Sequence, residues 1–440
     1  MKMRSTILSV LAIATLASCS SDDNNLNIPV SGEKTFAGFS IQVKDANTRA
    51  GGDEHADLVE QTVNGARLFI FNGGVLETIG DITIDPTTNK GTTSLATTTG
   101  NKLVYAVVNA NADMKMTVGT TLDSFKEQAV VAISDVIAES GQFVMIGKQT
   151  HILGKKTEAE AVQDINLVKI DASRAAAKVV MQYTDKVKIN PVVKGLFGDA
   201  NFRLDQSNTA MFLPRESYEL SPVGATADQK DLDVLNDGTY DHLQAVVADG
   251  SVGFKAAATT WNFAFVNSFY TAENINEAPT TGNTTFTMVR LKYTPDASVI
   301  NGTDKNLVGG TFYAVKTALG AWEIYANKGE ADAAQAAAPY NNAAGVSVVT
   351  AKIYTRGQCF YRLNLRDVTK TVLNEKYAVL RNHIYKINIT EVNGIGGNSP
   401  IDPDVILPVD PTTPLETETH ISAEITVLNW IPVEMNEPLG

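Results

Sequence analysis

The clearest chemistry near the start of the chain belongs to the four residues Leu16-Ala17-Ser18-Cys19. They come after a short basic segment at residues 2–4, at the end of an apolar stretch at 7–17 that is too short to span a membrane as a helix. This order is typical of a bacterial lipobox, in which a peptidase cuts between Ser18 and Cys19 and the Cys19 thiol carries a diacylglycerol. We predict that Cys19 is lipidated; the alternative is a plain secretory signal with an incidental cysteine.

Arg49 offers a second kind of chemistry, which is proteolysis. It lies in residues 45–54, which have no apolar periodicity and contain a Gly-Gly pair, so an exposed loop is expected. An Arg-specific protease would find an accessible bond between Arg49 and Ala50. An isolated arginine in a loop is usually only a solvated charge, so this prediction depends on the flanking elements.

The remaining reactive side chains form no enzyme motif. The five histidines have no metal-ligand spacing, and they are His55, His151, His242, His383 and His420. No Gly-rich phosphate loop or nucleophile elbow is present in the sequence. Cys359 lies in an alternating segment, so we predict a buried, inert thiol. These patterns predict no enzymatic activity, no cofactor and no metal.

Composition narrows the class of protein further. The net charge of −13 and the pI of about 4.9 argue against a nucleic-acid partner, because phosphate binding needs clustered Lys and Arg. The chain of 440 residues has room for two or three domains, and its apolar content of 44% allows a real core. Turn formers are plentiful beside recurring Thr and Val, which favours β structure.

The elements that must position Cys19 and Arg49 begin with a candidate strand between them. After a polar, acidic tether at residues 20–25, apolar and polar residues alternate over 37–44. The apolar positions of this predicted removable strand are Ala37, Phe39, Ile41 and Val43.

The body of the chain reads as short strands separated by turn signals. Strands are expected at 67–71, 102–109, 142–147, 165–170, 175–183, 263–269, 285–293, 310–315, 321–325, 358–365 and 384–392. Short helices are expected within 121–138 and at 331–338. The pattern predicts an all-β fold with minor α content, arranged as antiparallel β-sandwiches. Predicted segments are a signal peptide at 1–18, a propeptide at 19–49, sandwich domains at 50–187 and 188–395, a linker at 396–420 and a tail at 421–440.

The tail is the most informative segment. The linker before it contains Pro400, Pro403, Pro408, Pro411 and Pro414 and cannot form a regular ladder. The tail then alternates over residues 421–435, about 3.3 Å per residue or roughly 50 Å in all, which is longer than an ordinary strand. Together with Trp430, its predicted donor-strand residues are Ile421, Ala423, Ile425, Val427, Ile431, Val433 and Met435.

Such a tail needs a groove. Burying its apolar face contributes on the order of 10 kcal/mol as an upper estimate, whereas leaving it exposed invites aggregation. One alternative is that the tail folds back into its own second domain. Its length and linker favour insertion into an open sheet edge of a neighbouring molecule. The removable strand would fill that groove until cleavage after Arg49, and a head-to-tail contact that does not close gives a filament.

Both ends of the chain and parts of its body resemble the fimbrillins of Bacteroidales type V pili, in particular the minor-fimbrium stalk subunit type. The matching elements are the lipobox ending at Cys19, the segment 48–51 around Arg49, and the segments 104–109, 270–274, 380–385 and 424–430. Asn429 stands where the family often has proline before the tryptophan, which leaves the register of the tail open.

The resemblance implies two transthyretin-like β-sandwich domains and transport to the outer membrane as a lipoprotein. It also implies cleavage at Arg49 by an Arg-specific or trypsin-like protease and polymerisation by strand exchange. The implied partners are other copies of the chain, accessory anchor and tip subunits, the protease and an adhesion ligand in biofilm formation. The implied location is a cell-surface fimbrium.

Two alternatives in function stay open. One is a monomeric surface lipoprotein that binds glycans or host proteins. The other is a tip or anchor subunit, although the cleavable arginine and the long tail together favour a stalk subunit.

Overall fold

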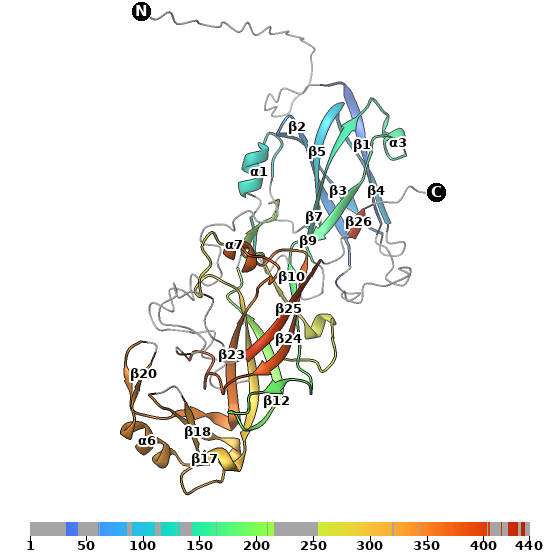
Figure 1. Cartoon of the computed structure of the whole chain (residues 1–440). Coiled ribbons are helices and arrows are strands. Elements are labelled where there is room, and N and C mark those ends of the chain that lie inside the picture. Colours follow the sequence, from blue (N-terminus) through green and yellow to red (C-terminus); the bar gives the residue numbers. More distant parts are fainter. Residues whose placement is uncertain are drawn as a thin grey trace, which may run out of the picture.

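The computed structural model describes residues 32–42, 60, 62–85, 90–110, 116–128, 130–132, 143–163, 165–208, 210–214, 254–318, 321–342, 344–402, 404, 415, 421–429 and 433–435. These residues form mainly β-strands in several sheets, with a few short helices, which confirms the predicted fold class. Figure 1 shows an elongated molecule with the N-terminal sheets at one end and the sheets of the later strands at the other. No helix in the described part is both long and apolar enough to cross a membrane.

The N-terminal part contains a six-stranded sheet in the order β26-β9-β7-β5-β2-β3. Its strands are β2 (Gly65–Asn72), β3 (Val75–Thr83), β5 (Gly100–Val108), β7 (Met145–Leu153), β9 (Ile170–Arg174) and β26 (Val433–Met435). A smaller sheet has the order β4-β1-β8, with β1 (Lys34–Gln42), β4 (Lys90–Thr98) and β8 (Leu167–Val168).

Side chains from both of these sheets meet in a first hydrophobic cluster, which includes Phe39, Leu68, Val104 and Val168. Helix α1 (Leu122–Gln128) adds Phe125 to it. The Phe125 ring lies 5.1 Å from two phenylalanine rings of β2, a spacing that favours tilted aromatic packing. The short strands β6 (Val130–Ala132) and β13 (Ala210–Phe212) pair beside this part.

The second part is a sandwich of two sheets around a second hydrophobic cluster. One sheet has the order β11-β24-β10-β15, with β25 also paired to β24. Its strands are β10 (Ala177–Gln182), β11 (Lys188–Ile189), β15 (Phe269–Thr271), β24 (His383–Val392) and β25 (Ile421–Asn429). The other sheet has the order β14-β12-β16-β23, with β12 (Gly195–Asp205), β14 (Lys255–Ala256), β16 (Phe286–Pro295) and β23 (Gln358–Asn364).

A third group of elements lies at the end of the molecule farthest from the N-terminal sheets (Figure 1). It contains β17 (Ile300–Asn301), β18 (Phe312–Lys316), β19 (Trp322–Tyr325), β20 (Tyr340–Asn341), β21 (Ser347–Val348), β22 (Lys352–Tyr354) and α6 (Lys328–Ala337). We call this group of strands and α6 the distal pole.

The other helices among the described residues are α3 (Glu158–Ala161), α7 (Leu373–Lys376), η3 (Phe265–Asn267), η4 (Ala297–Val299), η5 (Val308–Gly310) and η6 (Thr355–Gly357).

Strand β10 connects the two hydrophobic clusters. Val179 and Met181 belong to the second cluster, whereas Val180, on the opposite face of the strand, belongs to the first. Lys178 of the same strand is fully buried, and its Nζ lies 2.7 Å from Oε1 of the equally buried Glu60. The Tyr270 hydroxyl also donates to Glu60. This buried ion pair attaches Glu60 to β10, the strand that contributes to both hydrophobic clusters.

Most predicted strands are present. The strands expected at 67–71, 102–109, 285–293, 358–365 and 384–392 are β2, β5, β16, β23 and β24. The prediction of a strand at 263–269 is wrong, since the middle of that segment is the 3-10 helix η3 and β15 begins only at its last residue, Phe269. The Asn262 Oδ1 accepts a hydrogen bond from the Ala264 backbone N–H at 3.0 Å, a local turn that competes with a strand ladder. The predicted domain limits stay predictions.

Candidate functional site

Strand β1 fills a space between two strands that come later in the chain. It pairs antiparallel with β4 over its whole length, and Gly38 and Phe39 pair in parallel with β8. It is therefore the central strand of its sheet. We call the space between β4 and β8 the strand slot.

The apolar face of β1 points into the first cluster. Ala37 is 0% exposed and Phe39 is 1% exposed, and both belong to that cluster. The alternation predicted for the removable strand is confirmed at these two positions. The side chain of Ile41 and all of Val43 lie outside the described residues, so their predicted burial stays a prediction.

Buried polar contacts hold the first half of β1. The Thr35 hydroxyl donates to the Gly154 carbonyl at 2.7 Å and accepts from the Lys156 N–H at 2.9 Å. The Asn166 side chain is fully buried, and its Nδ2 donates to the Phe36 carbonyl at 2.7 Å and to the Gly154 carbonyl at 2.8 Å. Because a buried polar group needs its partners, removing β1 leaves unsatisfied groups as well as an apolar groove.

The residues predicted to be processed lie outside the described part of the chain. They are Ser18, Cys19, Arg49 and Ala50, and their roles stay predictions. The described chain resumes at Glu60, which is bound to β10 as described above. The slot strand β1 and the anchored residue Glu60 therefore lie on opposite sides of the predicted cleavage bond.

The first part of the tail is strand β25, which pairs antiparallel with β24 from Ile421 opposite Val392 onwards. Ile421 is 1% exposed and Ile425 is 4% exposed, and both belong to the second cluster. Ala423 and Val427 are half-buried against the same cluster. The predicted apolar face is confirmed over this stretch.

The second part of the tail reaches the N-terminal sheet. Strand β26 pairs antiparallel with β9, with Val433 opposite Ala172 and Met435 opposite Ile170, and it contacts β1. Figure 1 shows β25 in the lower body and β26 beside β9 in the upper one. Trp430 and Ile431 lie outside the described residues. The two described parts of the tail thus pair with two different sheets.

The strands that pair with the tail differ from those favoured by the sequence. The sequence favoured insertion into a neighbouring molecule, whereas in this single chain the tail pairs with its own β24 and β9. A single chain offers only its own sheet edges, and pairing with them removes apolar surface and ladder groups from water. The contacts of the tail in an assembly stay a prediction.

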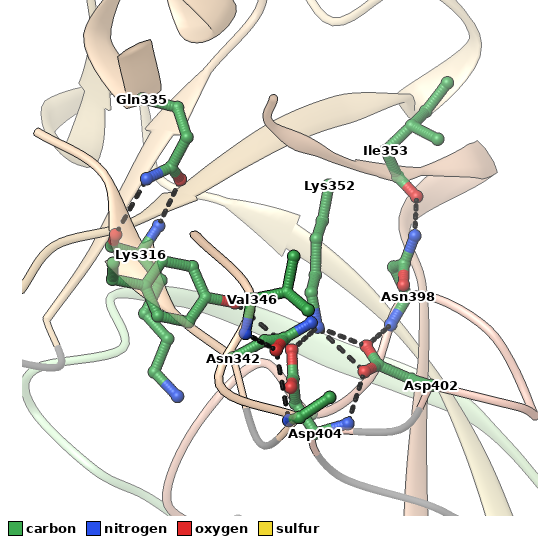
Figure 2. Close-up of polar contacts among 12 residues, drawn as sticks. Lys316, Gln335, Asn342, Val346, Lys352, Ile353, Asn398, Asp402 and Asp404 are labelled. Carbon is green, nitrogen blue, oxygen red and sulfur yellow. Dashed lines mark hydrogen bonds and ion pairs between the residues drawn. The ribbon is translucent and has the colours of Figure 1, made fainter. Parts of the chain in front are cut away.

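The predicted linker is anchored at its root in the distal pole (Figure 2). The Lys352 Nζ lies 2.7 Å from Oδ1 of Asp402 and 2.7 Å from Oδ2 of Asp404. The Tyr340 hydroxyl donates to Asp404 at 3.1 Å, and its burial, together with the nearby Asp404 carboxylate, raises the pKa of Tyr340. Asn398 donates to the Ile353 carbonyl at 3.1 Å. Asn398, Asp402 and Asp404 are therefore held against the body, although all three lie beyond the predicted start of the linker at residue 396.

Sequence reasoning missed the partners of the slot strand. Thr35 and Asn166 lie 131 positions apart, and nothing local in the sequence joins them. Gly38 carried a usable signal, since a glycine inside a strand often marks close approach of another backbone. The buried Glu60 was also missed, because it has no apolar periodicity around it.

Cys359 is fully buried in β23, and burial raises the pKa of its thiol well above the ordinary value. We expect a Cys19→Ser variant to react with a maleimide on the order of a hundredfold more slowly when folded than in urea, because the thiol must first be exposed. Mass spectrometry of timed samples measures this. Labelling at equal rates in both conditions would contradict the burial of Cys359.

Comparisons with known proteins are informative for the C-terminal part. Residues 352–436 match the family model described as major fimbrial subunit protein type IV, fimbrillin, C-terminal. This match includes the linker root and the tail as far as Asn436, and it bears out the resemblance to the fimbrillin family. No protein of curated function matches the chain.

Several solved structures are similar at low identity. A fimbrilin from Porphyromonas gingivalis is 12% identical, with 91% of this chain and 98% of that chain covered and a TM-score of 0.48. A tip fimbrial protein from the same organism, truncated at its C-terminus, is 10% identical, with coverages of 90% and 100% and a TM-score of 0.41. A fimbrial assembly protein from Parabacteroides distasonis is 12% identical, with coverages of 81% and 92% and a TM-score of 0.34.

Proposed function

We propose that the protein is a structural stalk subunit of a cell-surface fimbrium and not an enzyme, because residues 352–436 match the family model of the fimbrillin C-terminal part. In this role, each copy binds the next copy in the filament. The tail supplies a strand, the strand slot receives one, and accessory anchor and tip subunits begin and end the filament.

The observation that supports this proposal is the place of β1 relative to the predicted cleavage bond. β1 is the central strand of its sheet, yet both strands that flank it, β4 and β8, come from residues after Arg49. A cut after Arg49 leaves β1 held only by non-covalent contacts. Its loss would expose the sheet edges of β4 and β8 and the apolar surface that covers Ala37 and Phe39.

The free energy cost of an open slot favours insertion of another strand. Uncovering a buried phenylalanine costs about 1.5–3 kcal/mol, and unpaired ladder groups and Asn166 add to this cost. A strand with an alternating apolar face restores these contacts, and the tail has such a face. Addition of an extended segment to a sheet edge is an established mode of recognition between chains.

The tail has a seat in the single chain before any exchange. Pairing with β24 and β9 keeps Ile421 and Ile425 away from water until a neighbour offers a slot. Moving the tail to a neighbour replaces one ladder by another of similar kind. The net free energy that drives assembly then comes from filling the emptied slot.

Export completes the proposal. Lipidation of Cys19 anchors the precursor to the outer membrane without a membrane span. Cleavage after Arg49 by an Arg-specific protease removes the lipid and frees β1 in one step. The product is a surface filament that supports adhesion and biofilm formation.

Replacing Arg49 with alanine tests the cleavage step. We expect wild-type filaments to contain chains that begin at Ala50, and the R49A chain to stay lipidated and unassembled, because β1 remains covalently tethered. N-terminal mass mapping of surface filaments measures this. Lys44→Ala, which removes another positive charge nearby, should leave assembly and the Ala50 terminus unchanged. Filaments built from R49A chains that retain Cys19 would overturn the proposal.

A second candidate function is a monomeric surface lipoprotein that binds glycans or host proteins. The closed seat of the tail on its own chain favours it, as does a polar cavity of about 320 Å³ lined by residues that include Arg67, Asp81 and Asn109. Deleting the tail separates the two functions, since a monomeric binder keeps its activity without it.

A further inference from the structure

Helix α3 crosses the strand slot at Gly38. An ideal Cβ at Gly38 would lie 2.1 Å from the Ala161 carbonyl oxygen, 2.5 Å from the Ala161 carbonyl carbon and 2.7 Å from the Val162 Cα. All three are backbone atoms, so no side-chain rotation relieves the contact. Gly38 is not among the glycines with positive φ. Its requirement is therefore for space and not for an unusual backbone conformation.

Helix α3 is seated firmly over the slot despite its length. A capping box closes its first turn, in which Thr157 N–H donates to Glu160 Oε2 at 2.8 Å and Glu160 N–H donates to Thr157 Oγ1 at 3.4 Å. The Ser94 hydroxyl of β4 donates to Glu158 at 2.9 Å. Ala161 is fully buried. With β1 in place, α3 is therefore a closed cover on the slot.

The tail cannot sit beneath this cover in the way that β1 does. The chain has no glycine from residue 398 to residue 439. Whatever the register, any tail residue placed where Gly38 lies would bring a Cβ to within about 2 Å of the Ala161 backbone. Real Cβ atoms essentially never come within 3.0 Å of another heavy atom in this way, so either α3 or the inserted strand must move.

We propose that α3 is a gate over the strand slot, and that Gly38 is the residue that lets the gate close. The gate is shut over β1 in the precursor and is displaced when a tail takes the place of β1. This inference rests on the proposed strand exchange. It adds that the precursor and the assembled subunit differ in α3, and that the slot distinguishes its own β1 from a donor by the Cβ that Gly38 lacks and that every residue from 421 to 439 carries.

Displacement of α3 requires specific hydrogen bonds to be strained or broken. The Ala161 N–H to Thr157 carbonyl bond, at 3.1 Å, and the Gln163 N–H to Glu160 carbonyl bond, also at 3.1 Å, hold the turn in the closed state. The Ser94 to Glu158 contact attaches it to β4. A shift large enough to admit a Cβ strains or breaks these contacts, so backbone amide exchange in residues 158–163 reports the gate.

The test uses the full chain cut at Arg49, incubated with an excess of one of two peptides. One peptide copies residues 32–44 and the other copies residues 421–440. Release of the original β1 fragment, measured by mass spectrometry, shows that exchange occurs. We expect α3 to stay protected with the β1 copy and to exchange its amides at least about tenfold faster with the tail peptide, because opening the turn frees them.

Matched variants sharpen the result. A β1 copy with Gly38→Ala should behave like the tail peptide at α3 and bind more weakly than the unaltered copy. Among tail peptides carrying Ser422→Gly, Glu424→Gly or Thr426→Gly, the one whose glycine falls under Ala161 should restore protection of α3.

The outcomes separate the gate from the exchange. Equal protection of α3 with the β1 copy and with a bound tail peptide overturns the gate and leaves strand exchange standing. Failure of the tail peptide to release β1, while the β1 copy does so, overturns strand exchange itself and the gate with it.

Discussion

Replacing Lys178 with methionine is expected to lower the free energy of unfolding by about 3–5 kcal/mol, because it removes the Lys178 ammonium from a buried ion pair with the Glu60 carboxylate. Both side chains are 0% exposed, and the Nζ to Oε1 distance is 2.7 Å. The Phe263 carbonyl also loses its donor. Urea unfolding followed by tryptophan fluorescence and circular dichroism measures the change.

The controls for this prediction lie in the same chain. Lys155→Met removes an ion pair with Glu33 whose side chains are 72% and 67% exposed, so a change of less than about 1 kcal/mol is expected. Combining Lys178→Met with Glu60→Leu should recover part of the loss, since both charges of this pair are then removed together. A loss below about 1 kcal/mol for Lys178→Met alone would show that Glu60 reaches water or another partner.

Replacing Ile425 with aspartate is expected to abolish filament assembly. Ile425 is 4% exposed in the second cluster, and a charged side chain on the same apolar face would also be buried in a neighbour's slot. Negative-stain microscopy and sedimentation of Arg49-cleaved protein measure assembly. Ser347→Asp, which adds the same charge at an exposed position of the distal pole outside the tail and the slot, should leave filaments intact.

A mixing experiment separates a failed donor from a misfolded body. Cleaved Ile425→Asp subunits keep an intact strand slot, so they should accept a wild-type tail but offer none in return. Adding them to assembling wild-type protein should shorten the filaments in proportion to their share. Filaments of unchanged length and number would mean either that the slot is closed or that the tail is not the donor.

Features carried by local alternation were predictable from the sequence. The faces of β1 and β25 follow a period of two because one side of each strand is buried, and Ala37, Phe39, Ile421 and Ile425 lie where that period puts them. Cys359 is buried for the same reason. The Thr-rich strand β4 was missed because Leu95 is its one large apolar residue.

Features that depend on distant parts of the chain were not predictable. The parallel pairing of β1 with β8 joins segments 129 positions apart, and α3 over Gly38 is visible only once that pairing exists. The seat of the tail depends on which sheet edges are within reach, which a pattern within the tail does not encode. Lys352 carries no local signal for its two carboxylate partners.

Strand β10, which supplies side chains to both hydrophobic clusters, also bears on how the molecule responds to tension. A pull along the long axis passes from β24 into β10 and then through the bends at residues 175 and 176 into β9. This path is nearly continuous extended backbone, it is buried on both faces along residues 177–181 of β10, and it contains no hinge loop. Stretching the subunit must therefore shear whole ladders of hydrogen bonds at once, so the two parts resist extension as one stiff unit.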